Sequence, residues 1–344
     1  MPSYRTGEVT ELLSQRPGLQ RALVDLGADG PERAYVLTAL VGEVAVGDRV
    51  VLNTTAVDLD LGTGGWHVVH WNLSRESWEH AGAGHIMKLR YTSLQADVGA
   101  AEEDHPDLPD RIDATPVVAC GLHSQVGVVC ATIAHLRPGT RVAYVMTDGA
   151  ALPLALSDLV AALLERGLLA TTVTSGNAFG GDLEAVALPS ALALAVHVGG
   201  AEVVVVGMGP GVVGTGTTLG NTAVEVAGII DTATALGAEP LVCARASSGD
   251  ARDRHRGLSH HTATALALAR SAAVVPLPAG QGLAVDDRGT HRQVEVEVPD
   301  VAGILSGLDL EITSMGRGPG ADPLFFATAA AAGVAAARRL DVAR

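Results

Sequence analysis

The apolar and polar positions along the chain follow two different rhythms. The N-terminal part holds short β-prone runs, among them EVTELL, RAYVLTAL and WHVVHWNL, which are separated by turn residues. Short strands at this spacing are typical of a small antiparallel barrel or sandwich. An acidic, proline-bearing run without apolar periodicity, AEEDHPDLPDR, comes next and has the character of a linker. We therefore expect a small all-β barrel-like domain at 1–96, a linker at 97–114 and a second domain at 115–344.

Beyond the expected linker, buried apolar runs alternate with segments of helical character. This alternation is the signature of a mainly parallel sheet with helices on both faces. The larger domain is therefore predicted to be a doubly wound α/β fold. Strands are expected at 115–121, 141–147, 169–175, 201–207, 240–244, 272–277 and 293–299, and helices at 124–136, 154–166, 189–198, 219–236, 259–269 and 323–340.

The composition of the chain indicates which partners and which cellular location to expect. The chain has 344 residues, with 23 Lys and Arg against 38 Asp and Glu, for a net charge of −15. We expect neither nucleic acid nor an anionic membrane as a partner, because both require a basic surface. Cys120, Cys130 and Cys243 lie in apolar runs without CxxC spacing, which indicates reduced, packed thiols. Together with an N-terminus that lacks an apolar run, this favours a cytoplasmic protein.

In an open parallel sheet, ligands bind at the carboxyl ends of the strands. The loop after the fourth expected strand, GMGPGVVGTGTT, leads from the most apolar strand towards a helix. Glycines let the backbone approach a ligand, and free amides before a helix favour an anion such as phosphate. The glycine spacing is neither a dinucleotide fingerprint nor a P-loop, and a tight packing turn is the alternative. The expected anion-binding residues are Gly209, Gly211, Gly214, Thr215, Gly216 and Thr217.

The densest group of charged residues follows the fifth expected strand. It holds arginines, aspartates and three histidines, His255, His260 and His261. Histidine side chains titrate near neutral pH and ligate metals, so these three are candidates for acid/base chemistry or for a divalent metal, although their spacing matches no metal signature. A solvated Arg/Asp loop is the alternative. His123, Asp148 and Asp182 follow other strands and are the further catalytic candidates, whereas a serine hydrolase is not expected because no GxSxG occurs.

The shared histidine site sets a condition on strand order. His123 follows the first expected strand, and the other three histidines follow the fifth. Neighbouring strands lie about 4.8 Å apart, so the side chains share a ligand only if these strands are one or two positions apart.

A second glycine loop at 315–323 contains Arg317, whose guanidinium is a candidate donor to an anion. A linker or a packing loop is an equally good interpretation of this segment.

Several motifs together resemble an uncharacterised bacterial family that is known only as a domain of unknown function. They are GTGGWH, GHIMKLRYT, DGAALPLALSDL, AFGGDLEAV, VVVVGMGPGVVGTGT and RHRGLSHHT, and the resemblance spans the chain from Gly7 to about Pro278. The resemblance implies no reaction, substrate or catalytic residue. The argument for function therefore rests on the residues themselves.

The residues favour an enzyme or sensor that acts on a small phosphorylated or otherwise anionic metabolite at the carboxyl edge of the sheet. The alternative is a non-catalytic assembly or regulatory module in which the glycine loops only pack helices. We expect a homo-oligomer, since the chain is acidic yet rich in apolar residues. The cofactor is unknown, with a divalent metal as the candidate.

Overall fold

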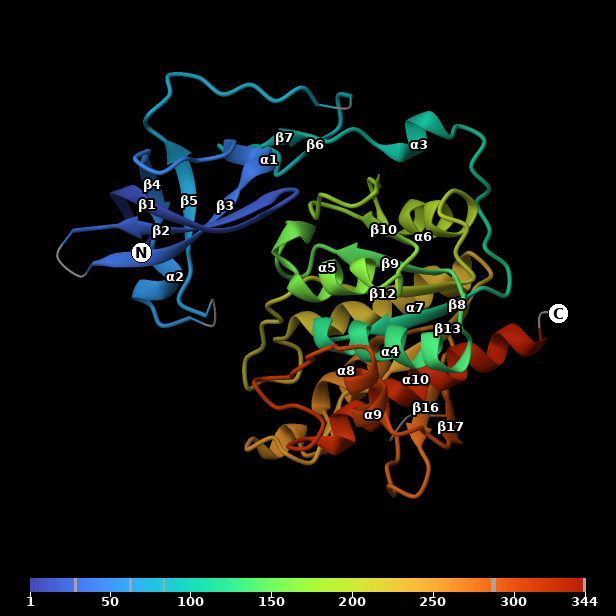
Figure 1. Ribbon diagram of the computed structural model, residues 1–344. Coiled ribbons are helices and arrows are strands. Elements are labelled where there is room, and N and C mark those ends of the chain that lie inside the picture. The colour runs from blue at the N-terminus through green and yellow to red at the C-terminus, as the bar shows by residue number, and fades with distance from the viewer. Residues whose placement is uncertain (28–29, 62–63, 83, 286–288, 343–344) are drawn as a thin grey trace. The chain divides into compact units, whose positions relative to one another are not determined.

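The computed structural model describes residues 1–27, 30–61, 64–82, 84–285 and 289–342. Gly62 and Thr63, which begin the GTGGWH motif, lie outside these residues. The chain forms two compact units, Met1–Gly99 and Ala100–Arg344 (Figure 1). Each unit has its own core and is described by itself.

The first unit is a closed five-stranded β-barrel. Its strands follow the order β1-β2-β3-β5-β4, and β4 closes the barrel by pairing with β1. Five-stranded Greek-key barrels are also the architecture of OB-folds. Val9, Ala22, Val36 and Leu52 are fully buried inside, which follows from the alternation of apolar and polar residues. The strands are β1 (Tyr4–Arg16), β2 (Leu19–Asp25), β3 (Pro31–Leu37), β4 (Arg49–Asn53) and β5 (His67–Asn72); the short elements are α1 (Thr38–Val41), α2 (Thr55–Asp58), β6 (Met87–Lys88) and β7 (Ala96–Asp97).

The second unit is built on an eight-stranded sheet in which every pairing is parallel. The order is β11-β10-β9-β12-β8-β13-β16-β17. The predicted α/β fold class, with a small β-barrel before it, is confirmed. The strands are β8 (Pro116–Cys120), β9 (Val142–Thr147), β10 (Thr171–Thr174), β11 (Leu183–Glu184), β12 (Val203–Met208), β13 (Glu239–Cys243), β16 (Val274–Pro278) and β17 (Arg292–Val296).

Helices cover both faces of this sheet (Figure 1). Alternate residues of each strand point into two separate cores: Val118 and Cys120 of β8 lie in one, and Val117 and Ala119 in the other. The first core also contains α4 (His123–Leu136), α5 (Asp158–Glu165), α9 (Val301–Gly307) and α10 (Pro323–Val342); the second contains α6 (Leu188–His197), α7 (Glu225–Ala235) and α8 (His260–Leu268). Among the helices of the described residues, none combines the length and apolar character needed to cross a membrane.

Three segments differ from the elements expected at these positions. The helix expected at 219–236 begins only at Glu225, after a 3₁₀ turn at Thr222–Val224. The glycine loop is therefore longer and does not lead directly into the helix. The short α9, capped by the Asp300 side chain, was not expected. Within 97–114, the segment 101–104 is the helix α3 (Ala101–Asp104), and Ile112 is buried against the second core.

Gln125 fastens the start of α4 to the end of β13. Its side chain is fully buried, accepts a hydrogen bond from the Leu122 amide (3.0 Å) and donates to the carbonyls of Cys243 and Ala244 (3.1 Å each). These bonds satisfy three backbone groups at the point where β13 leaves the sheet. They thereby set the position of the segment that follows β13.

We predict that Gln125→Leu lowers the free energy of unfolding of the second unit by about 3 kcal/mol, because three buried backbone groups lose their partners. Urea denaturation followed by circular dichroism measures this. Ser124→Ala, one residue away on the same helix, should change stability by less than about 0.5 kcal/mol. Equal effects of the two substitutions would contradict this role of Gln125.

Candidate functional site

The strand order brings the histidine segments together. β8 and β13 are neighbours, with Cys120 paired to Cys243, so the loops that follow them leave the same point of the sheet edge. A cavity of about 430 Å³ lies there. It is lined by Leu122, His123, Ser124, Leu159, Pro210, Gly211, Val212, Gly214, Thr215, Arg245, Arg252, Arg254, His255, His261, Glu311, Ile312, Thr313, Ser314 and Met315.

Arg245 is the buried cation of the site. It comes two residues after β13 and is only 7% exposed. Nη1 of Arg245 donates to Nδ1 of His261 (3.1 Å), and Nη2 lies 3.7 Å from Oδ2 of Asp250. Burial, with a smaller contribution from the Arg252 charge, lowers the pKa of Arg245 to about 10, so the guanidinium stays charged at neutral pH.

Asp250 is the counter-ion on which the arginines converge. Arg252 holds it with a two-pronged hydrogen bond (2.9 and 2.8 Å), and Nη2 of Arg317 donates to it from the second glycine loop (3.2 Å). Mainly through the Arg252 hydrogen bond, the pKa of Asp250 lies well below its usual range. Arg317 also bonds Asp322 (3.2 Å), so its guanidinium fastens the second glycine loop to the site.

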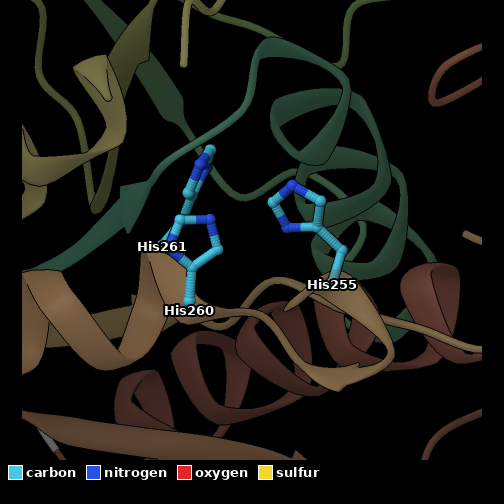
Figure 2. A group of neighbouring side chains, drawn as sticks. All are labelled: His255, His260 and His261. Carbon is cyan, nitrogen blue, oxygen red and sulfur yellow. The ribbon is translucent and has the colours of Figure 1, made fainter. Parts of the chain in front are cut away.

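Three histidine rings gather where α8 begins (Figure 2). Ser259 caps the helix, which places His260 and His261 in its first turn, while His255 reaches the same point from the preceding loop. One nitrogen from each ring lies within 4.8 Å of the others. Burial, followed by the charge of Arg245, lowers the pKa of His255 to about 4 and that of His261 to about 3, so both rings are neutral at pH 7.

Hydrogen bonding defines which nitrogen of the His261 ring carries the proton. A guanidinium only donates, so Nδ1 of His261 accepts from Arg245 and the neutral ring carries its proton on Nε2. The Ser259 hydroxyl accepts from the His261 amide (3.3 Å) and shares a hydrogen bond with Nδ1 of His255 (2.7 Å). The buried His261 ring thus presents an N–H donor.

This proton arrangement does not fit a metal held by all three rings. A ligating nitrogen needs a free lone pair, and the other nitrogen of the ring usually donates to a carboxylate or carbonyl. His261 can ligate only if its bond with Arg245 breaks, because the partner of Nδ1 is itself a donor. The surrounding guanidiniums of Arg245, Arg252 and Arg254 add repulsion to any cation.

Further donors face the same cavity. Arg254 lines it and forms neither an ion pair nor a hydrogen bond with any residue that the structure describes. The main-chain amides of Gly211, Val212 and Gly214 also have no hydrogen-bond partner within the described part of the chain. Against these donors, Glu311 is the one carboxylate among the cavity-lining residues.

Only half of the predicted anion-binding residues reach the cavity. Gly211, Gly214 and Thr215 line it, whereas Gly209, Gly216 and Thr217 do not. The hydroxyls of Thr215 and Thr217 bond each other (2.8 Å) and accept from amides of the same turn, so the turn at 215–220 is closed on itself. A side chain at Gly209 has no room beside the Ala151 carbonyl, which explains the glycine by packing.

His123 lines the cavity but has both ring nitrogens occupied. Nδ1 donates to the Met208 carbonyl (3.1 Å), and the Ser157 hydroxyl, which accepts from the Val160 amide, donates to Nε2 (2.7 Å). Burial lowers the pKa of His123 to about 4. The ring therefore connects the ends of three elements as a neutral group.

The two aspartates predicted for the site lie away from the cavity. Asp182 accepts from the amide and hydroxyl of Thr172 in β10, three strands from β8. Asp148 accepts from the Asn177 amide beside the end of β9. A catalytic role for either remains a prediction from the sequence.

Glu225, at the start of α7, was not among the predicted residues. It accepts from the Thr147 hydroxyl (2.8 Å), and burial raises its pKa to about 7, with Asp148 adding to the effect. Arg245, Arg254 and the lining residues after α9 were also missed as site residues. The density of charged residues at 245–256 could have indicated the two arginines as site residues. Nothing in the sequence pattern distinguished Ile312 or Met315 from ordinary core or surface residues.

Comparison of sequences places the chain in a family. Residues 33–333 match the profile of a family described as protein of unknown function, DUF3866, and the chain belongs to that family. This confirms the resemblance seen in the motifs. No curated protein and no solved structure is significantly similar to the chain.

The lowered histidine pKa values predict that stability falls as pH drops from 7 to 5. His123, His255 and His261 take up protons near pH 6.5 when unfolded but only near pH 4 or below when folded, so the unfolded state binds more protons in this range. Glu225, with a raised pKa, opposes them by one proton. The net difference of about two protons gives about 2.7 kcal/mol per pH unit, and His260, whose pKa burial also lowers, adds to this slope.

Urea denaturation at pH 7, 6 and 5 measures this slope. His261→Gln keeps an acceptor for Arg245 and should remove about one proton from the difference. His135→Gln, at an exposed position in the last turn of α4, is the matched control. A slope that is the same in the wild type and in His261→Gln would show that the buried ring does not titrate as described.

Proposed function

We propose that the cavity between the loops after β8, β12 and β13 binds a small anionic metabolite. The observation that carries the proposal is Arg254, a cation without an ionic partner among the described residues, on the wall of a cavity that also holds the buried Arg245. The whole chain carries a net charge of −15, so a concentration of cationic and N–H donors at one point needs a specific reason.

The buried His261 supports the same ligand chemistry. Nε2 of its neutral ring carries a proton and so acts as a donor, as do the free amides of the glycine loop. Guanidinium, imidazole and amide donors are the groups that proteins use for phosphate and carboxylate. A cavity at the carboxyl ends of parallel strands, near the middle of the sheet, is also where such folds bind ligands.

The proposal favours binding or sensing over catalysis. At neutral pH a general base works best with a pKa near 7. The pKa values of the histidines that line the cavity are about 4 or lower. Their neutral rings suit recognition through hydrogen bonds. The proposal therefore assigns these side chains to holding the anion and assigns no bond-making step.

Titration of the protein with sulfate and inorganic phosphate should raise its melting temperature, because a ligand that binds only the folded state stabilises it. Arg254→Gln should weaken binding by about 10- to 100-fold, the effect of removing a charged hydrogen bond. Calorimetric titration gives the dissociation constants.

Arg256→Gln is the control for this substitution. Arg256 lies two residues further along the same loop, bonds the Asp250 carbonyl (3.0 Å) and is not among the cavity-lining residues. It should leave the dissociation constant within about twofold of wild type, within the scatter of mutations outside a site. Absence of any thermal shift up to millimolar concentrations of both anions would contradict the proposal.

A further inference from the structure

The geometry points to a phosphate monoester with an aliphatic body as the ligand class of this cavity. This inference rests on the proposed anion site and adds the shape and chemistry of the rest of the ligand. It follows from three features: donors on separate elements, apolar side chains in the same lining, and a cavity much larger than one anion.

The donors reach the cavity from different elements. Arg254 and Arg245 belong to the segment after β13, His261 belongs to α8, and the free amides of Gly211 and Gly214 belong to the loop after β12. A planar carboxylate is satisfied by one guanidinium fork, whereas a tetrahedral phosphate presents three terminal oxygens in different directions. Donors that arrive from three elements match the phosphate better.

Five apolar side chains form the apolar part of the wall. Leu122 and Ile312 are 6% and 5% exposed, and Leu159, Val212 and Met315 line the cavity with them, beside the polar Ser124, Glu311, Thr313 and Ser314. These side chains come from the start of α4, from α5, from the glycine loop and from the segment after α9. Burial of hydrocarbon against such a wall releases water and strengthens binding in proportion to the area covered.

The volume of the cavity and the residue types that line it further limit what the non-phosphate part of the ligand can be. The cavity volume of about 430 Å³ lies within the range of about 300 to 1,000 Å³ of pockets that bind whole small molecules. None of the described residues that line it is Phe, Tyr or Trp, and its histidine and arginine side chains are engaged in hydrogen bonds or assigned to the anion, so none is set aside to stack on a nucleotide base. An aliphatic or alicyclic body fits the lining better than a purine.

The test compares ligands that change one part at a time, by calorimetric titration into the full-length protein. The length of the aliphatic body is varied with inorganic phosphate and with methyl, butyl and hexyl phosphate. Hexanoate replaces the phosphate group by a carboxylate, and adenosine monophosphate replaces the aliphatic body by a nucleoside. We expect binding to tighten from methyl to hexyl phosphate, by up to roughly fourfold for each methylene that is buried. Hexyl phosphate should bind more tightly than both hexanoate and adenosine monophosphate.

A pair of variants tests the apolar wall. Val212→Thr keeps the side-chain shape but replaces a methyl group by a hydroxyl, so the ratio of hexyl to methyl phosphate affinity should fall at least twofold. Val213→Thr, at the adjacent exposed residue outside the cavity lining, should leave the ratio unchanged. Binding of methyl phosphate itself should be the same in both variants and the wild type.

The outcomes separate this inference from the proposed function. If phosphate binds but affinity does not change with chain length, or if Val212→Thr and Val213→Thr behave alike, the aliphatic body is wrong and the anion site stands. Equal binding of hexanoate and hexyl phosphate overturns the phosphate assignment, and tighter binding of adenosine monophosphate overturns the aliphatic one. If no anion binds, the proposed function fails with it.

Discussion

The site depends on a buried arginine at the end of a central strand. Arg245 is held in the protein interior by Asp250, whose carboxylate also pairs with Arg252 and Arg317. A charged side chain is buried only when it is paired and hydrogen-bonded. Once in place, its guanidinium donates to His261, and this single bond turns a ring that could accept a metal into a donor.

The pairing of the arginines with Asp250 also accounts for the positive charge of the cavity lining. Asp250 compensates part of the charge of Arg245, Arg252 and Arg317, but Arg254 lies beyond its reach and has no counter-ion within the described residues. Arg245, Arg252 and Arg254 line the cavity and Glu311 is the one carboxylate among the lining residues, so the lining holds more cations than anions inside an acidic protein. A metal ion would add to this excess, whereas an anion relieves it.

The layered fold could be read from the sequence because its strands are buried on both faces. Runs such as AEVVVVG have too little polarity for anything but a central strand, and the predicted strand at 201–207 overlaps β12 (Val203–Met208). The start of α7 was misplaced because apolar periodicity alone does not show that Thr215 and Thr217 close a turn with their hydroxyls. Such local bonds compete with helix formation and leave no periodic signal.

The site was harder to predict than the fold. The sequence identified His255 and His261 by residue type, yet their hydrogen-bond partners, Ser259 and Arg245, are seen only in three dimensions. Asp148 and Asp182 also follow strands, but those strands are two and three positions from β8, so the sequence position alone placed them too near. Ile312 and Met315 reach the cavity through tertiary packing that no motif records.

The most direct test of the account is the protonation of the His261 ring, measured by nitrogen NMR on protein labelled with ¹⁵N-histidine and assigned with His261→Gln. The account predicts a proton on Nε2 and a free lone pair on Nδ1 at pH 7, with signals that move on addition of sulfate and stay in place on addition of Zn²⁺. A proton on Nδ1, or shifts of all three histidines with one equivalent of Zn²⁺, would show that the cluster is a metal site and would contradict the account.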